Sequence, residues 1–267
     1  MEKGFLKPNE IAENWIEIGS KKANLSIINM IVLGILAGIF IGFGAHGDII
    51  LIQTLGSIDI GLAKFMGAAV FPVGIMLVVM AGAELFTGNN LMALSVMTGK
   101  EKMITVFKNW TFVYIGNFIG SIILAFLLSK SGLYGEAAAL KAVAIAESKI
   151  SITFSQAVIR GVMCNILVVL AVWMQTGAKD FIGKIFILWF PVMLFVLSGF
   201  EHSIANMYFI PLGKYLGGNF TWSQMWLNNI IPVTIGNLIG GALIIPTAYW
   251  ISYLIISKKK DKKSIVA

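Results

Sequence analysis

Charge is scarce in this sequence of 267 residues: only 12% are Asp, Glu, Lys or Arg, whereas 58% are hydrophobic. Soluble domains carry about 25% charged residues, so this chain lacks the charge that a water-facing surface needs. Its mean hydropathy of +0.86 predicts a membrane protein. The chain has 20 basic and 13 acidic residues. In a membrane protein, basic residues indicate on which side of the bilayer each loop lies, so this excess does not point to nucleic acid, and we expect no nucleic-acid partner.

Cysteine and histidine are also rare. The single cysteine, Cys164, excludes an internal disulfide and any multi-cysteine metal site, and there are only two histidines. We therefore expect no metal and no cofactor. Sequence patterns for phosphate binding, serine hydrolysis and intramembrane carboxylate chemistry are absent, which argues against an enzyme. The start of the sequence, 1–22, is rich in charge and has no apolar run, so we expect no cleavable signal peptide.

Charged residues divide the sequence into segments that are compared with the roughly 20 apolar residues of a membrane-spanning helix. Four segments are long enough and free of charge: 23–47, 109–129, 161–178 and 229–256. Two more, 65–99 and 185–213, each contain one carboxylate, Glu84 or Glu201. We interpret all six as spans, which predicts an all-α membrane protein with six transmembrane helices, forming a single transmembrane domain over 1–267. The polar stretch 217–228 suits the membrane interface better than lipid.

Six spans place both termini on the same side of the membrane. Fourteen of the 20 basic residues lie in the N-terminal segment, the loops after the second and fourth spans, and the C-terminal tail. By the positive-inside rule, this distribution predicts a cell-membrane protein with both termini in the cytoplasm. Segment 1–24 is then cytoplasmic, and 258–267 is a basic cytoplasmic tail that we expect to fix topology and to contact anionic lipid.

The two halves of the sequence repeat one another. Segments 109–120 and 229–240 share seven of twelve residues, and Gly82-x-Glu84 matches Gly199-x-Glu201 at nearly the same offset. A three-span unit, 25–130, that recurs at 150–257 must enter the membrane with opposite polarity, which predicts an aquaporin-like inverted repeat. We interpret the second and fifth spans as broken helices whose non-helical joints are supported by Glu84 and Glu201. A proton relay through these glutamates is the alternative.

His202 has no histidine counterpart in the first half, where Leu85 occupies the equivalent position. An isolated histidine is most often a buried structural residue. His202, however, directly follows Glu201 at a predicted break inside the membrane. Because the unperturbed pKa of histidine is about 6.5, such a residue is a candidate for a functional role near neutral pH.

Five patterns in the sequence are distinctive: Gly82-Ala-Glu-Leu-Phe-Thr-Gly-Asn89, Lys108-Asn-Trp with Val113-Tyr-x-Gly-Asn117, Arg160-Gly-Val-Met-Cys-Asn165, Ala171-Val-Trp-Met174 and Gly199-Phe-Glu-His-Ser-Ile-Ala-Asn-Met207. Together they resemble the formate/nitrite transporter family, and the resemblance extends over 10–255. It implies a pentamer of aquaporin-like protomers, each with its own pore for a small monovalent anion, namely formate, nitrite or hydrosulfide. The implied site consists of a central group of His202, Thr87 and Asn165, a cytoplasmic constriction of Leu85, Phe195 and Ile75, an outer constriction of Phe71, Phe86 and Val168, and Lys149 in the outer vestibule.

The patterns and the resemblance together predict a channel for small anions of weak acids, in which His202 supplies positive charge or a proton. A secondary active, proton-coupled anion transporter is the main alternative, because inverted repeats with broken helices also occur in such transporters. A channel for water or neutral solutes is a third. The expected partners are a small anionic substrate, the lipid bilayer and further copies of the chain.

Overall fold

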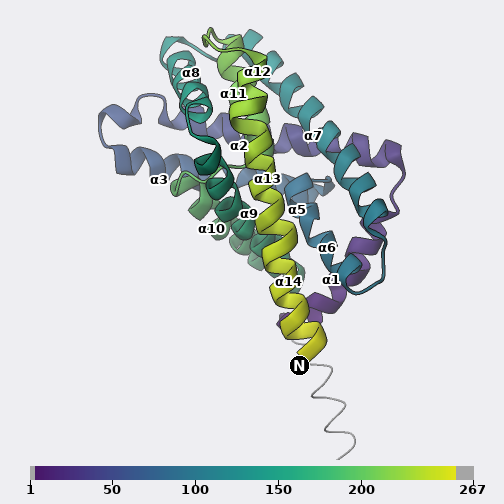
Figure 1. Cartoon of the computed structure of the whole chain (residues 1–267). Helices are drawn as coiled ribbons and strands as arrows, with labels where there is room; N and C mark the ends of the chain where they lie inside the picture. Colours follow the sequence, from purple (N-terminus) through teal and green to yellow (C-terminus); the bar gives the residue numbers. More distant parts are fainter. Residues whose placement is uncertain (1–3, 257–267) are drawn as a thin grey trace, which may run out of the picture.

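The computed structural model describes residues 4–256, which form helices and loops with one isolated bridge between Phe5 and Ala178. The predicted basic tail, 258–267, lies outside the described residues. In Figure 1, α1 (Pro8–Ala23) and α14 (Ile245–Tyr249) lie towards one end of the molecule, and α8 (Glu136–Ile150) lies at the other. The remaining α-helices are α2 (Ile27–Ile52), α3 (Ile60–Val70), α4 (Val73–Met76), α5 (Phe86–Asn89), α6 (Ala93–Met97), α7 (Met103–Lys130), α9 (Phe154–Gly177), α10 (Phe181–Leu197), α11 (Ser203–Tyr215), α12 (Trp222–Gln224) and α13 (Ile231–Leu238). Short 3-10 and π-helical segments join several of them, among them Leu77–Gly82, Met225–Ile230, Ile239–Ile244 and Trp250–Ile256.

Several helices begin at a side chain that accepts a hydrogen bond from the first turn. Ser26 caps α2, Asp59 caps α3, Thr153 caps α9 and Asp180 caps α10. Such caps satisfy backbone N–H groups that have no partner within the helix. They occur in the short polar loops between apolar segments, so the helix starts follow from the local sequence.

Five helical segments among the described residues are long and apolar enough to cross a membrane: Ile27–Ile52, Ile60–Gly82, Met103–Lys130, Phe154–Gly177 and Trp222–Ile256. The apolar helix α10 is shorter, with 17 residues. The last segment begins before the predicted start at 229, because Thr221 and Gln224 form a reciprocal capping box that starts the helix at Trp222. The chain is thus a multi-pass membrane protein by length and composition.

The two halves contain the same kind of close helix pair. A Cβ atom on Gly120 of α7 would lie 2.0 Å from the carbonyl oxygen of Ile35 on α2, and one on Gly240 would lie 2.3 Å from that of Val162 on α9. Only glycine allows two helix backbones to approach so closely. Gly120 and Gly240 are equivalent in the sequence repeat, so the repeat specifies one helix contact twice.

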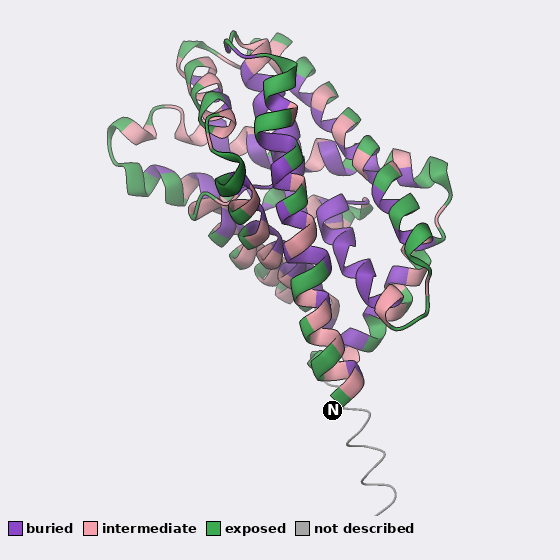
Figure 2. Cartoon of the chain, in the orientation of Figure 1, coloured by how far each residue is buried: buried purple, intermediate pink, exposed green. Residues whose placement is uncertain are grey.

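The middle of the molecule is occupied by segments that are buried on all sides. Every residue from Leu85 to Ser95 is buried, and so is every residue of α11 up to Gly213, as the central purple ribbons in Figure 2 indicate. α11 packs against α7 and α8. The sequence analysis assigned no helix to 131–149, where α8 lies against α11 through Ala142 and Ala146.

Helical structure stops twice beside this buried centre. The helix that begins with α3 ends at Gly82, which has a φ of +93°, and the chain is extended until α5 begins at Phe86. α10 ends at Leu197, Gly199 has a φ of +70°, and α11 begins after an extended His202. Because glycine has no Cβ, it adopts positive φ without strain. Each glycine therefore turns the chain away from its helix two residues before a glutamate.

Candidate functional site

Two cavities enter the molecule, one near each end of α2. The first cavity, of about 370 Å³, includes Leu33 of α2, and the second, of about 310 Å³, includes Asp48 and Ile52 of the same helix. Helices rise about 1.5 Å per residue, so Leu33 and Asp48 are separated by roughly 20 Å along the axis. The interrupted segments with Glu84 and Glu201 lie on the first and second cavity, respectively.

An ion pair of Glu84 with Lys22 lies at the first cavity. Lys22 Nζ is 2.6 Å from Glu84 Oε1, and the Asn89 amide donates to Oε2 at 2.6 Å. Asn89 also donates to Asn109, whose own amide donates to the backbone carbonyl of Lys22. The glutamate side chain is only 9% exposed, so its charge depends on these partners.

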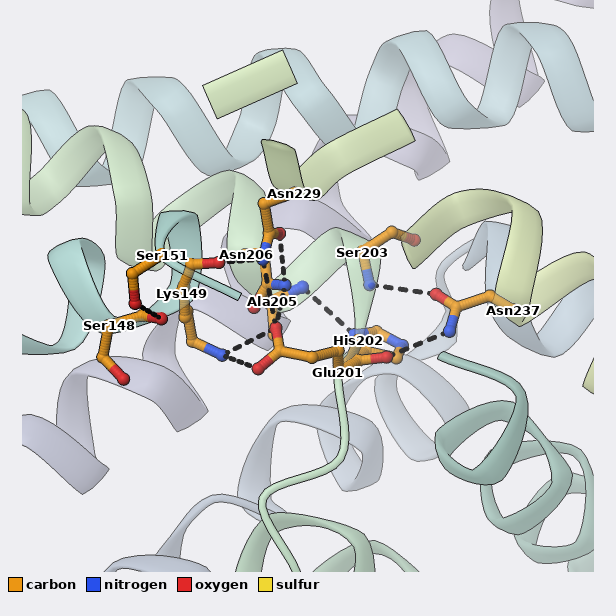
Figure 3. Close-up of polar contacts among 10 residues, drawn as sticks. All are labelled: Ser148, Lys149, Ser151, Glu201, His202, Ser203, Ala205, Asn206, Asn229 and Asn237. Atoms are coloured by element: carbon orange, nitrogen blue, oxygen red, sulfur yellow. Dashed lines mark hydrogen bonds and ion pairs between the residues drawn. The ribbon is translucent and has the colours of Figure 1, made fainter. Parts of the chain in front are cut away.

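The second cavity contains the equivalent cluster, drawn in Figure 3. Lys149 Nζ lies 3.2 and 3.1 Å from the two oxygens of Glu201, and the Asn206 amide donates to Glu201 Oε2 at 2.5 Å. Asn206 donates to Asn229 at 2.7 Å, and Asn229 donates to the carbonyl of Lys149 at 2.8 Å. The same closed network of one lysine, one glutamate and two asparagines, joined by four contacts, therefore occurs once in each half of the chain.

Two buried asparagines hold the interrupted segments against the long helices. The Asn117 amide donates to the carbonyls of Gly34 and Glu84, and its oxygen accepts from the N–H of Phe86 at 3.0 Å. Asn237 does the same with Gly161, Glu201 and Ser203. These bonds satisfy backbone groups that the helix breaks leave without partners.

Side chains from the two halves meet at His202 and Thr87. His202 Nε2 lies 2.8 Å from Thr87 Oγ1, and His202 Nδ1 accepts from the N–H of Ala205 at 3.0 Å. Since Nδ1 is an acceptor, the neutral ring carries its proton on Nε2 and donates it to Thr87. His202 is 3% exposed and faces the second cavity, whereas Thr87 is fully buried.

Asn165 contacts the backbone of Thr87 and is not among the residues that line either cavity. Its amide donates to Asn90 and to the carbonyl of Asn237, both at 2.7 Å, and more weakly to the carbonyl of Thr87 at 3.4 Å. This arrangement brings Asn165 to the predicted central group as a support of the Thr87 backbone.

The apolar site residues are grouped differently from the sequence-based expectation. Leu85 and Ile75 line the first cavity, but Phe195 lines the second together with Phe71, because its ring stacks on His202 with centroids 5.8 Å apart. Phe86 lines neither cavity. Leu85 lines the first cavity and Thr87 contacts His202, whereas the ring of Phe86 between them packs on Tyr114 with centroids 4.9 Å apart. Val168 is buried in the core and lines neither cavity.

Lys22 was not among the predicted site residues, and Lys149, which was predicted to lie in the outer vestibule, forms an ion pair with Glu201. The two lysines precede their glutamates by 62 and 52 residues, so no single offset aligns them. The sequence repeat therefore gave no signal for this pairing.

The fold and the site define a multi-pass membrane channel or transporter: two cavities, each with a buried ion pair, approach one polar pair from opposite ends. The family model for formate/nitrite transporters matches residues 9–251, and the chain belongs to that family. This confirms the family resemblance. Members of the family are transporters and channels, so the prediction that the chain is not an enzyme is confirmed as well.

Characterised and uncharacterised relatives cover nearly the whole chain. "Uncharacterized transporter YrhG" of Bacillus subtilis is 43% identical, covering 97% of this chain and 96% of its own. "Formate channel BtFdhC" of Bacillus thuringiensis is 40% identical, covering 93% and 96%. A solved structure described as a pentameric formate channel with formate bound is 35% identical, with a TM-score of 0.75 over 89% of this chain and 98% of that chain.

Proposed function

We propose that the chain forms a channel for small monovalent anions of weak acids, with formate as the first candidate and nitrite and hydrosulfide as the others. The observation that carries the proposal is the His202–Thr87 pair, at 2.8 Å, buried between two cavities that each contain a lysine. The names of two proteins to which the chain is similar, the formate channel of Bacillus thuringiensis and the solved pentameric formate channel, support formate.

The proposed topology has six spans, with 60–97 and 181–215 as the two broken ones. The helix ends at Gly82 and Leu197 support it, and so does the equivalence of Asn117 and Asn237. Both termini are then cytoplasmic in the cell membrane, and the first cavity, which contains Lys22 of α1, opens to the cytoplasm. By similarity to the pentameric relative, five copies assemble.

The lysines attract an anion, and the apolar residues between the cavities oppose its passage. A bare anion loses much more hydration free energy in an apolar constriction than a neutral acid does. Leu85 and Ile75 lie on the first-cavity side, and Phe71 and Phe195 on the second. Between these two apolar sets, His202 and Thr87 offer hydrogen bonds that partly replace water.

His202 acts first as a hydrogen-bond donor. Its Nε2–H donates to Thr87, and an anion in the centre replaces the threonine hydroxyl as the acceptor. A proton leaves Nε2 at low cost only if Nδ1 gains one, and a protonated Nδ1 no longer accepts from the N–H of Ala205. Proton transfer to the anion is therefore coupled to the loss of the cap at the start of α11.

A flux panel on the purified protein in liposomes tests the proposal. We expect rapid passage of formate. The relative fluxes of formate, nitrite and hydrosulfide show which of the three anions the channel conducts best. Flux that saturates at low anion concentration, with a fixed number of protons moved per anion, would indicate a proton-coupled transporter instead of a channel. Fluxes of all three anions equal to those of protein-free liposomes would refute the proposal.

A further inference from the structure

The second cavity contains a carboxylate that none of the preceding roles uses. Asp48 of α2 lines this cavity and is 8% exposed. A Cβ atom on Gly67 of α3 would collide with Asp48 Oδ1, so the missing side chain of Gly67 leaves the room that the carboxylate occupies. Among the residues that the structure describes, no side chain forms a hydrogen bond or an ion pair with Asp48. A carboxylate in this position is therefore solvated by the cavity and not by the protein.

The charges that line the two cavities differ in number. Within the described part of the chain, the first cavity is lined by one lysine and one glutamate, which pair with each other. The second cavity is lined by two basic and two acidic side chains: Lys64, Lys149, Asp48 and Glu201. Glu201 pairs with Lys149, so the charge of Asp48 offsets that of Lys64. Lys141 of α8 adds to the positive charge near Asp48, although it does not line the cavity.

The first cavity has a neutral side chain at the position that corresponds to Asp48. Gly34 of α2 and Gly161 of α9 pack against glycines that the sequence repeat makes equivalent, Gly116 and Gly236. Fourteen residues further along the two helices lie Asp48 and Gln175, and each lines the cavity at its own end of the molecule. The carboxylate of Asp48 is therefore not part of the duplicated support of the helix breaks.

We propose that Asp48 sets how tightly the second cavity holds an anion: its carboxylate offsets part of the lysine charge, so that an anion enters this cavity without being retained there. The inference rests on the proposed function. A conducting pore must attract its ion strongly enough for entry and weakly enough for exit. Lys64 and Lys149 supply the attraction, and a carboxylate in the same wall shortens the stay of the anion.

The size of the effect follows from the interaction of two unit charges. In water, a charge at roughly 8 Å changes the local concentration of a monovalent anion by about 2-fold, and a poorly exposed wall increases the effect because its dielectric constant is lower. Removal of the Asp48 charge should therefore strengthen anion binding in the second cavity by about 2- to 5-fold.

The test measures formate flux into liposomes as a function of formate concentration, for wild-type protein and for Asp48→Asn. Asparagine keeps the shape of the side chain and removes its charge. We expect the formate concentration at half-maximal flux to fall by about 2- to 5-fold, and we expect the maximal flux to fall as well, because the anion leaves the cavity more slowly.

A second variant makes the opposite change in the other cavity. Gln175→Glu adds a carboxylate at the equivalent position of the first cavity, and it should raise the half-maximal concentration by about 2-fold or more. Glu136→Gln, at an exposed carboxylate that begins α8 and lines neither cavity, is the matched control and should leave both flux parameters unchanged.

Each other outcome counts against the proposal. An unchanged or higher half-maximal concentration in folded Asp48→Asn overturns it. A lower half-maximal concentration with an unchanged or higher maximal flux also overturns it, because Asp48 would then oppose entry without assisting exit. If Asp48→Asn does not fold, Gln175→Glu decides the question, and an unchanged half-maximal concentration in that variant contradicts the proposal. Wild-type protein that conducts no formate refutes the proposed function instead of this inference.

Discussion

Replacing Lys149 by methionine should destabilise the protein more than removing the whole Glu201–Lys149 pair. Both side chains are poorly exposed, at 16% for Lys149 and 6% for Glu201. Removal of one partner from a buried ion pair leaves a buried charge without compensation, which costs about 3–5 kcal/mol. In Lys149→Met the Glu201 carboxylate keeps the Asn206 amide at 2.5 Å and the Asn229 amide at 3.4 Å, which places the expected cost near the lower limit.

The double variant Lys149→Met/Glu201→Gln removes both charges and keeps a polar group beside Asn206. Its expected cost is about 1 kcal/mol, since replacing a whole buried pair is often nearly neutral. Lys22→Met, at the first cavity, should cost less than Lys149→Met because Lys22 is 23% exposed and its Glu84 partner is more accessible to water.

Thermal unfolding of the detergent-purified protein, followed by tryptophan emission, measures these differences. A loss of 3 kcal/mol corresponds to a decrease in the midpoint of roughly 6–12 °C for a chain of this size. Lys149→Met should show such a decrease, and most of it should be recovered in the double variant. Equal midpoints for the single and double variants would refute the assignment of Glu201 as a buried carboxylate that depends on Lys149.

Two further predictions concern the supports of the site. Asn237→Ala removes one accepted and two donated hydrogen bonds inside the apolar interior, which should lower the free energy of unfolding by about 2–4 kcal/mol. Asn228→Ala, at a more exposed amide, is the control. Equal unfolding midpoints for the two variants would contradict the role of Asn237. Glu101 lies outside the spans, and hydrogen bonds led by that from Ser20 hold its pKa below the usual value. The contribution of Glu101 to folding stability should be fully present above the unfolded pKa of about 4.3 and be lost as the pH falls through the lowered folded pKa. Glu101→Gln should remove this part of the pH dependence of stability. An identical pH dependence of stability in wild type and variant would contradict the prediction.

Much of the fold follows from patterns that the sequence displays directly. Paired glycines and glutamates indicated where helical structure stops, because both the positive φ of glycine and a buried acid need a special backbone. The equivalence of Asn117 and Asn237 was visible in the repeat, although their hydrogen bonds to the interrupted segments were not.

Helix α8 was not predicted, for a physical reason. At 15 residues it is too short to span a bilayer, and it contains two glutamates and two lysines, so it has neither the length nor the composition of the other helices. Its signal is alanine at every fourth position: Ala138, Ala142 and Ala146 are all buried. This small stripe permits close contact with α11, where a Cβ on Gly213 would lie 2.4 Å from that of Ala146.

The grouping of the apolar site residues depends on side-chain direction, which the sequence motifs do not encode. Phe86 and Thr87 are adjacent, yet Thr87 contacts His202 while the Phe86 ring packs on α7. Phe195 joins Phe71 because the end of α10 brings its ring onto His202. Motif similarity identifies such residues, but only the fold determines which cavity they line.

The central claim is that His202 binds the anion between the two cavities through a hydrogen bond and exchanges a proton with it. Formate flux into liposomes tests this claim most directly. His202→Asn should lose most of the flux and the accompanying pH change. His46→Asn, at the other histidine, which contacts Tyr134 and lines neither cavity, should retain both. A folded His202→Asn protein with wild-type formate flux and wild-type pH dependence would contradict the account.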